Sequence, residues 1–214
     1  MCRLLYVNSN KEFKIADYLA KFAVISKQSK EFQGHGWGCA YLQNGKWQYY
    51  KNVNPVWEDD FSKFGSTTRL IAHARSAFKD EGIIVENNMP FYDDKYIFVF
   101  NGELRGVKIK EDGRIGAEKI FNYIKRFDKG ILKGALQKGT EIITKKSSYV
   151  RAMNIIMTDE NAAYVYSQFN EDENYFTLNV KKSNDCIVVC SDPFVDENDW
   201  LKLNNNSLTE FKCF

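Results

Sequence analysis

The chain begins MCRLLYV (residues 1–7), where a cysteine at position 2 is followed by a run of β-forming residues. Cysteine is small enough for the methionine before it to be removed, which would place a thiol and a free α-amine on one residue. Such an amine has an ordinary pKa of roughly 7.7 to 8, so part of it is neutral near pH 7 and can activate its own nucleophile. This stretch predicts a self-activating nucleophile at Cys2, although a cysteine at this position can also be incidental.

Short β-like runs continue from this start to about residue 100. They are residues 37–42 (WGCAYL), 46–52 (KWQYYKN), 69–76 (RLIAHARS) and 96–101 (YIFVFN). Asn44 and Gly45 separate the first two of these runs, and Asn-Gly is a strong hairpin signal. Between the first and second strands, residues 16–32 carry apolar side chains at helical spacing, which predicts an amphipathic helix on a sheet.

The second half of the chain begins with a helical pattern and returns to strands. Residues 116–144 carry an apolar stripe that includes Ile120, Phe121 and Ile124. Four strand-like runs follow at residues 153–158, 162–169, 175–180 and 185–190. The charged segments TDEN (158–161) and NEDEN (170–174) are typical of hairpin turns. This order predicts an α+β domain of two sheets with helices outside them, and we expect residues 1–214 to form one domain.

Charge and composition exclude several classes of function. The formal net charge is +2, from 30 basic and 28 acidic residues, and the lysines are scattered, so we expect no nucleic-acid partner. No apolar stretch approaches the roughly 20 residues of a membrane span, and the first residues lack the pattern of a signal peptide. We therefore expect a cytoplasmic protein that does not bind membranes.

Five cysteines are present, and they lack the close-set pairs of a zinc ribbon. Cys186 and Cys190 lie four positions apart in a strand-like run, so their thiols share one face. We interpret them as buried, reduced thiols, with metal binding as the alternative. A metal site would also be expected to use histidine, and the chain has only His35 and His73.

Five motifs in a fixed order make the sequence resemble the class II glutamine amidotransferases, most closely the small stand-alone branch without a synthase domain. They are MCRLLYV, GHGWGCAYL (34–42), AHARSA (72–77), ENNMPF (86–91) and FNGEL (100–104). The segment CIVVCSDPF and the later Trp200 resemble the C-terminal strand and loop of that branch. The resemblance implies the N-terminal-nucleophile hydrolase fold, a four-layer αββα sandwich.

The resemblance also assigns roles to particular residues. Cys2 would be the nucleophile, and the Asn101 side-chain amide and Gly102 backbone N–H would form the oxyanion hole. Arg75 would bind the α-carboxylate of a glutamyl substrate, because a guanidinium group can hold two oxygens at once. Ser76 and Gly102 would also contact the substrate. Without the resemblance, a strand-end arginine or an Asn-Gly turn would be read as structural. We expect His73 to point away from Arg75 on that strand and to have a hydrogen-bonded structural role.

Two departures from the family pattern concern the substrate. Met89 stands before Pro90 where the family usually has histidine. Gly116, with Ala117 and Glu118, stands where the family has Asp-Ser-Glu or Asp-Thr-Glu, and that aspartate binds the α-ammonium group of the substrate. Losing this contact would cost roughly 1.5 to 3 kcal/mol. We expect free glutamine to bind weakly, unless Asp112 or Glu118 supplies the carboxylate.

The expected reaction is hydrolysis of the side-chain amide of glutamine or a γ-glutamyl compound through a thioester on Cys2. No cofactor or metal is expected. Ammonia would be released or passed to a separate synthase, because the chain carries no synthase domain. The alternative is a non-enzymatic relative that keeps the fold and binds a ligand or partner protein, which the glycine at position 116 would favour.

Overall fold

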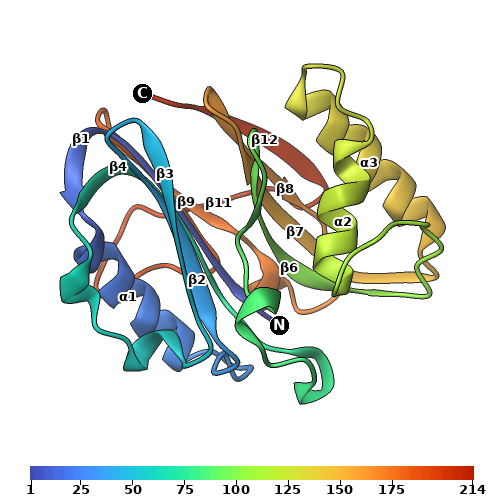
Figure 1. Cartoon of the computed structure of the whole chain (residues 1–214), viewed down its shortest axis with the longest axis horizontal. Helices are drawn as coiled ribbons and strands as arrows, with labels where there is room; N and C mark the ends of the chain where they lie inside the picture. Colours follow the sequence, from blue (N-terminus) through green and yellow to red (C-terminus); the bar gives the residue numbers. More distant parts are fainter.

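Two antiparallel sheets pack face to face in a computed structural model that describes residues 1–214, except for the side chain of Asp80. The seven-stranded sheet has the order β11-β9-β10-β1-β4-β2-β3, and the five-stranded sheet has the order β12-β8-β7-β6-β5. Helix α1 covers the outer face of the larger sheet, and α2 and α3 cover that of the smaller one (Figure 1). The predicted four-layer αββα sandwich is confirmed.

The bounds of the elements are as follows. The larger sheet contains β1 (Arg3–Lys14), β2 (Trp37–Gln43), β3 (Lys46–Asn52), β4 (Ser66–Ala74), β9 (Asn179–Lys182), β10 (Cys186–Cys190) and β11 (Leu201–Lys202). The smaller sheet contains β5 (Phe91–Tyr92), β6 (Ile97–Arg105), β7 (Tyr149–Thr158), β8 (Ala162–Ser167) and β12 (Ser207–Lys212). The α-helices are α1 (Ile15–Lys27), α2 (Gly116–Lys125), α3 (Leu132–Lys146) and α4 (Glu173–Phe176). Short 3₁₀ turns are Val56–Glu58, Phe61–Lys63, Phe78–Asp80 and Val85–Asn87.

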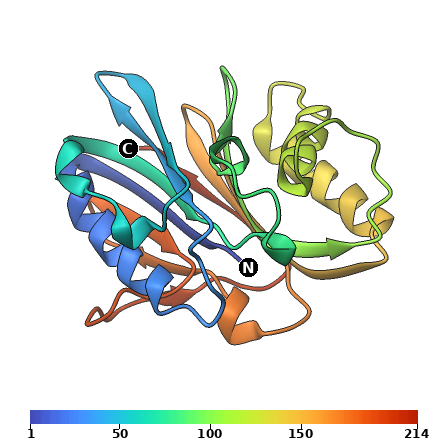
Figure 2. The same ribbon diagram turned by 60° about the horizontal axis from the view of Figure 1, so that its bottom comes forward.

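Strand β1 lies in the middle of the larger sheet and is buried on both faces. Leu4 and Tyr6 point toward the smaller sheet, whereas Leu5 and Val7 point toward α1, as the alternation of a strand requires. A strand buried in this way is apolar at successive positions, which explains the continuous run in the sequence. Its first residues, and therefore Cys2, are held between the two sheets, where Figure 2 places the N-terminus.

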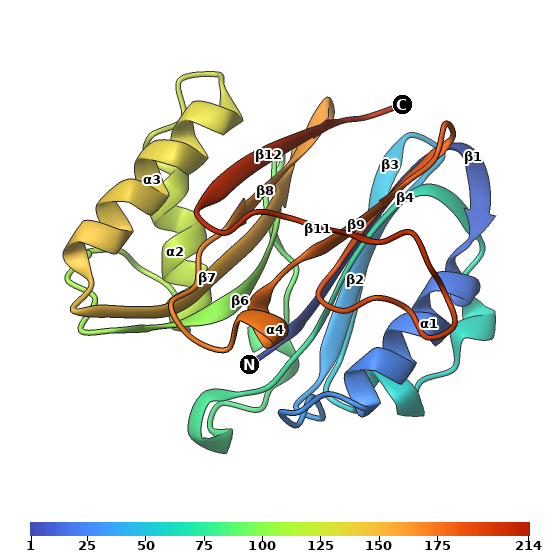
Figure 3. The same ribbon diagram turned by 180° about the vertical axis from the view of Figure 1, so that it is seen from behind.

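Two sequence predictions about turns have different outcomes. The hairpin at Asn44 and Gly45 is confirmed, because both residues have positive φ angles, 51° and 72°, and Gln43 pairs with Lys46. The NEDEN segment is not a hairpin turn. Strand β8 before it belongs to the smaller sheet and β9 after it to the larger one, so the chain crosses between the sheets through α4 (Figure 3).

Tyr175 and Phe176 accordingly end α4 instead of starting a strand, and strand structure begins at Asn179. The helical pattern of residues 116–144 is divided between α2 and α3. Gly130, with φ of 85°, lies between them, and its backbone N–H donates to Asp128 at 2.7 Å. The expected helix over residues 16–32 ends earlier, at Lys27.

Candidate active site

Cys2 lies directly before β1, at the point where β4 ends beside it. Arg3 pairs with Ala74 at the end of β4, so Arg75 and Ser76 continue past the first strand and flank Cys2. The Ser76 backbone N–H donates to Cys2 Sγ at 3.5 Å, and Sγ lies 3.7 Å from the Ser76 carbonyl oxygen. The register of two adjacent strands therefore places the thiol against the backbone of Ser76.

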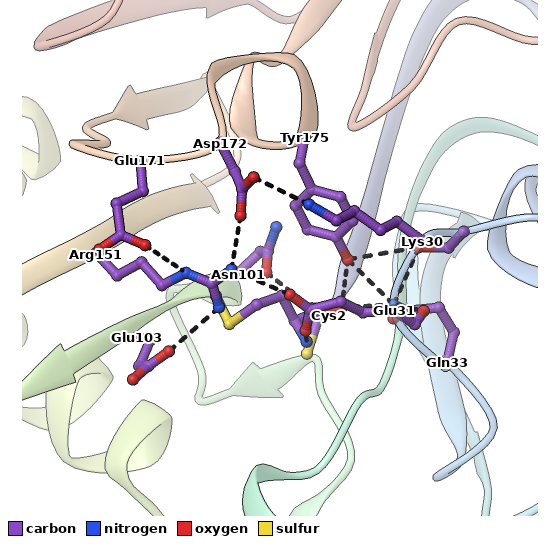
Figure 4. Close-up of polar contacts among 12 residues, drawn as sticks. Cys2, Lys30, Glu31, Gln33, Asn101, Glu103, Arg151, Glu171, Asp172 and Tyr175 are labelled. Atoms are coloured by element: carbon purple, nitrogen blue, oxygen red, sulfur yellow. Dashed lines mark hydrogen bonds and ion pairs between the residues drawn. The ribbon is translucent and has the colours of Figure 1, made fainter.

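Asn101 and Gly102 approach Cys2 from β6 in the opposite sheet. The Cys2 backbone N–H donates to Asn101 Oδ1 at 2.8 Å (Figure 4). Asn101 is 1% exposed, and its Nδ2 group has no hydrogen-bond partner among the described residues. Gly102 lies so close to β7 that an added Cβ would overlap the Ala152 carbonyl oxygen. Position 102 therefore requires glycine. The unused amide donor beside Cys2 is Asn101 Nδ2.

Arg75 is buried at the mouth of the site. Its Nη1 donates to the Gly82 carbonyl at 2.9 Å, and its Nη2 lies 3.5 Å from the Glu81 carbonyl. A guanidinium group has more N–H donors than these two carbonyls accept, so the others can bind a ligand. Its backbone is held as well, because the Arg75 N–H donates to the Gly36 carbonyl at 2.9 Å.

A cavity of about 730 Å³ opens at these residues. Cys2, Arg75, Ser76 and Gly102 line one side, which we call the sheet wall. Asn101 is not among the lining residues. The structure thus brings the sequence-predicted site residues together from three strands that are far apart in the chain.

Solved structures with a similar fold include proteins described as glutamine amidotransferases. Glutamine phosphoribosylpyrophosphate amidotransferase from B. subtilis, complexed with ADP and GMP, matches with a TM-score of 0.65 at 16% identity, over 99% of this chain and 49% of its own. A glutamine aminotransferase class-II domain protein from Silicibacter pomeroyi matches with a TM-score of 0.66 at 15% identity, over 99% of both chains. A predicted glutamine amidotransferase from Pseudomonas aeruginosa gives 0.64 at 14%, over 99% of this chain and 97% of the other.

The chain has the class II glutamine amidotransferase fold. It spans about half the length of the B. subtilis enzyme, 49%, and nearly all of the two shorter proteins. No family model matches the sequence, and no curated protein matches it. The similarity is therefore one of structure.

A second part of the cavity lining is formed by the end of β6, the segment after it and the start of α2. We call this part the loop wall and define it by its apolar residues: Leu104, Val107, Ile109, Ile115, Ala117 and Ile120. Gly116 lies among them, and an added Cβ there would have no atom within 4 Å. The position where the family pattern has aspartate thus faces the cavity of this amidotransferase fold and has room for a side chain.

Neither acidic residue that could replace that aspartate lines the cavity. Glu118 forms an ion pair with the Arg114 guanidinium at 2.5 Å, and the Asp112 carboxylate is also absent from the lining. The carboxylates that line the cavity are Glu81 and Glu103. Glu103 is paired with two arginines, whereas no ion pair of Glu81 is seen among the described residues. Met89 is buried in the lining and adds a further apolar surface.

Met1 occupies a polar recess beside Cys2, which the sequence did not predict. Its carbonyl accepts hydrogen bonds from Tyr175 OH at 2.7 Å and from Gln33 Nε2, and its ammonium group pairs with Glu31 (Figure 4). Arg151 connects to the same Glu31 at 3.3 Å and to Asp172 at 2.7 Å. The sequence does not indicate that these residues around Met1 lie together, because they come from three separate segments.

The local charges act on the Cys2 thiol in opposite directions. Burial raises the pKa of the thiol, whereas the N-terminal ammonium, the Ser76 hydrogen bond and Arg75 lower it, and Glu31 raises it further. Burial also raises the pKa of the four other cysteines. With Met1 attached, the Cys2 nitrogen is an amide and cannot act as a base.

His73 lies in β4, two residues before Arg75, and is fully buried. The expectation that it points away from Arg75 is wrong, because residues two apart along a strand direction share a face. Burial lowers its pKa to about 3, and the nearby Arg75 and Lys51 add to this effect. The ring nitrogens have no hydrogen-bond partner of good geometry among the described residues, although the Phe100 backbone raises the pKa slightly. At neutral pH the imidazole is uncharged.

The described side chains include no group of three or more His, Cys, Asp or Glu residues placed to hold a metal ion. Cys186 and Cys190 lie in strand β10 and pack against the apolar layer under α1. None of the helices that the structure describes has the length and apolar character needed to cross a bilayer.

Proposed function

We propose that this chain is an amidohydrolase whose nucleophile is Cys2 after loss of Met1. The observation that supports the proposal best is that the Cys2 thiol and the Arg75 guanidinium group line one cavity, while Asn101, which has an unused amide donor, accepts a hydrogen bond from the Cys2 backbone. A buried donor without a partner costs roughly 1 to 3 kcal/mol. A negatively charged oxygen formed near it during the reaction would recover that cost.

The reaction follows from the chemistry of these groups. Loss of Met1 converts the Cys2 nitrogen from an amide into an amine, which takes the thiol proton and makes Sγ a thiolate. The thiolate attacks the side-chain amide carbonyl of the substrate, and its oxygen accepts hydrogen bonds from Asn101 Nδ2 and the Gly102 N–H. The α-ammonium group returns its proton to the leaving nitrogen, and water then hydrolyses the thioester.

Arg75 would orient the substrate by binding its carboxylate with the donors that the loop carbonyls leave unused. Ser76 would fix the thiol through its backbone. The product pair is a carboxylic acid and ammonia, or an amine when the amide nitrogen is substituted. A separate synthase that accepts ammonia is compatible with this reaction, and the chemistry does not depend on one.

The experiment compares two forms of the protein, one lacking Met1 and one purified from cells in which methionine aminopeptidase is inhibited. Intact-mass analysis establishes the N-terminus of each form. We expect the form that begins at Cys2 to release ammonia from glutamine amides and its thiol to be alkylated before the other four. Protein from the native host that keeps Met1, or equal reactivity of the two forms, would contradict the proposal.

A further inference from the structure

The loop wall has the character of a surface that binds an apolar group. Its six defining residues come from one continuous part of the chain, residues 104–120, and all of them are at least half buried. They line the same cavity as Cys2 and Arg75. A substrate held by both of these residues would extend its remaining substituents toward this apolar surface.

Charged groups near the loop wall do not favour an ammonium group there. Arg114 is paired with Glu118, Arg105 with Glu103, and Lys119 is exposed at the start of α2. No unpaired carboxylate is present among the described residues of this wall, and the wall carries cations at its edge. Glu81, the other carboxylate of the cavity, belongs to the segment that Arg75 contacts.

The cavity is also larger than free glutamine requires. Its volume of about 730 Å³ lies within the roughly 300 to 1,000 Å³ of pockets that enclose drug-sized ligands. A substrate of the size of glutamine would leave the loop wall in contact with water. An additional apolar group on the substrate would remove that surface from water, which is favourable.

We propose, on the basis of the function proposed above, that the substrate is glutamine with an apolar acyl group on its α-nitrogen. The side-chain amide would lie at Cys2, the carboxylate at Arg75 and the acyl chain on the loop wall. Acylation makes the α-nitrogen a neutral amide, so the missing carboxylate at Gly116 no longer matters. Water then converts the N-acylglutamine into N-acylglutamate and ammonia, with the acyl group retained.

The test is a series of N-acylglutamines of increasing chain length, from acetyl to octanoyl, with free glutamine for comparison. Each methylene that is buried should raise kcat/KM by roughly fourfold until the cavity is filled. We expect octanoylglutamine to be hydrolysed at least 100-fold better than glutamine.

Substitutions at two neighbouring residues, one on the loop wall and one outside the cavity, test whether the loop wall binds the acyl chain. Val107→Asp places a charge on the wall and should reduce the ratio of octanoyl to acetyl activity at least tenfold. Lys108→Asp, at an exposed position next to it and outside the cavity, should leave that ratio unchanged. Thermal melting of both variants shows whether the fold is kept.

Each contrary result has a distinct meaning. If acetylglutamine is hydrolysed but longer chains bring no gain, the acyl site is wrong and the amidohydrolase remains. If free glutamine is preferred and Glu81→Gln removes the preference, Glu81 binds the ammonium group and the proposal is overturned. If the form that begins at Cys2 hydrolyses none of these amides and its thiol is not selectively alkylated, the proposed function fails, and this inference fails with it.

Discussion

The two walls of the cavity are built in different ways. On the sheet wall, paired strands hold Cys2 and Arg75, and the positions follow from the register of β1, β4 and β6. The loop wall belongs largely to a connecting segment that includes Gly106 and Gly113, both with positive φ angles. Reaction chemistry requires atoms held within fractions of an ångström, which strands provide, whereas an apolar surface tolerates variation. Under the proposed function, the strands would fix the reaction and the loop wall would set the substrate.

The largest expected effect is on the sheet wall. Asn101→Ala removes one of the two proposed oxyanion donors and should lower kcat about 100- to 1,000-fold. Asn154→Ala is the matched control, because Asn154 is a buried asparagine that pairs with Asn101 across β6 and β7 but bonds to the Phe176 carbonyl. It should lose stability and keep its kcat. Normal turnover by a folded Asn101→Ala protein would remove Asn101 from the mechanism.

Arg75→Ala tests the part of the sheet wall that would bind a carboxylate. Loss of a charge-assisted contact worth roughly 1.5 to 3 kcal/mol should lower kcat/KM about 10- to 150-fold for substrates with an α-carboxylate. Simple amides without that group should be little affected. Arg69→Ala, in the strand β4 that precedes Arg75, serves as the control, because Arg69 is bonded to the Glu160 carbonyl. An equal loss with both substrate types would show that Arg75 is only structural.

A third prediction concerns the effect of the buried residue His73 on the free energy of unfolding. The pKa of His73 in the folded protein, about 3, lies below its ordinary value of 6.5. The contribution of neutral His73 to the free energy of unfolding is therefore present above pH 6.5 and is lost as the pH falls toward 3. When the pH is lowered from 7 to 5, His73 is protonated in the unfolded chain only, and we expect this to lower the free energy of unfolding by about 2 kcal/mol. Urea unfolding of wild type and His73→Gln at both pH values measures it. An equal pH dependence in the two proteins would contradict the assignment.

The smallest effect is expected on the loop wall. Gly116→Asp restores a carboxylate at a position with open space and should improve kcat/KM for free glutamine about tenfold, without improving N-acylglutamines. Gly134→Asp, at an exposed and equally open position of α3, is the control. If Gly116→Asp changes nothing, another carboxylate supplies the contact, and the distinction between the two walls weakens.

Much of the fold followed from local sequence patterns. The apolar run at residues 4–7 and the Asn44-Gly45 turn depend on near neighbours, so they were predicted correctly. The layers followed from the order of strands and helices. The segment 170–180 was misassigned because its path depends on which sheet each flanking strand joins, and no residue within it encodes that choice.

The sequence alone supplied the residue types of the site, Cys2, Arg75, Ser76, Asn101 and Gly102, through motifs in a fixed order. Only the tertiary structure brought together the Met1 recess, formed by Glu31, Gln33 and Tyr175, and the apolar residues that line the cavity with Cys2. The reason is physical. A motif reports residues adjacent in the chain, whereas a recess is formed by side chains from separate segments whose contact depends on how the two sheets and α2 pack together.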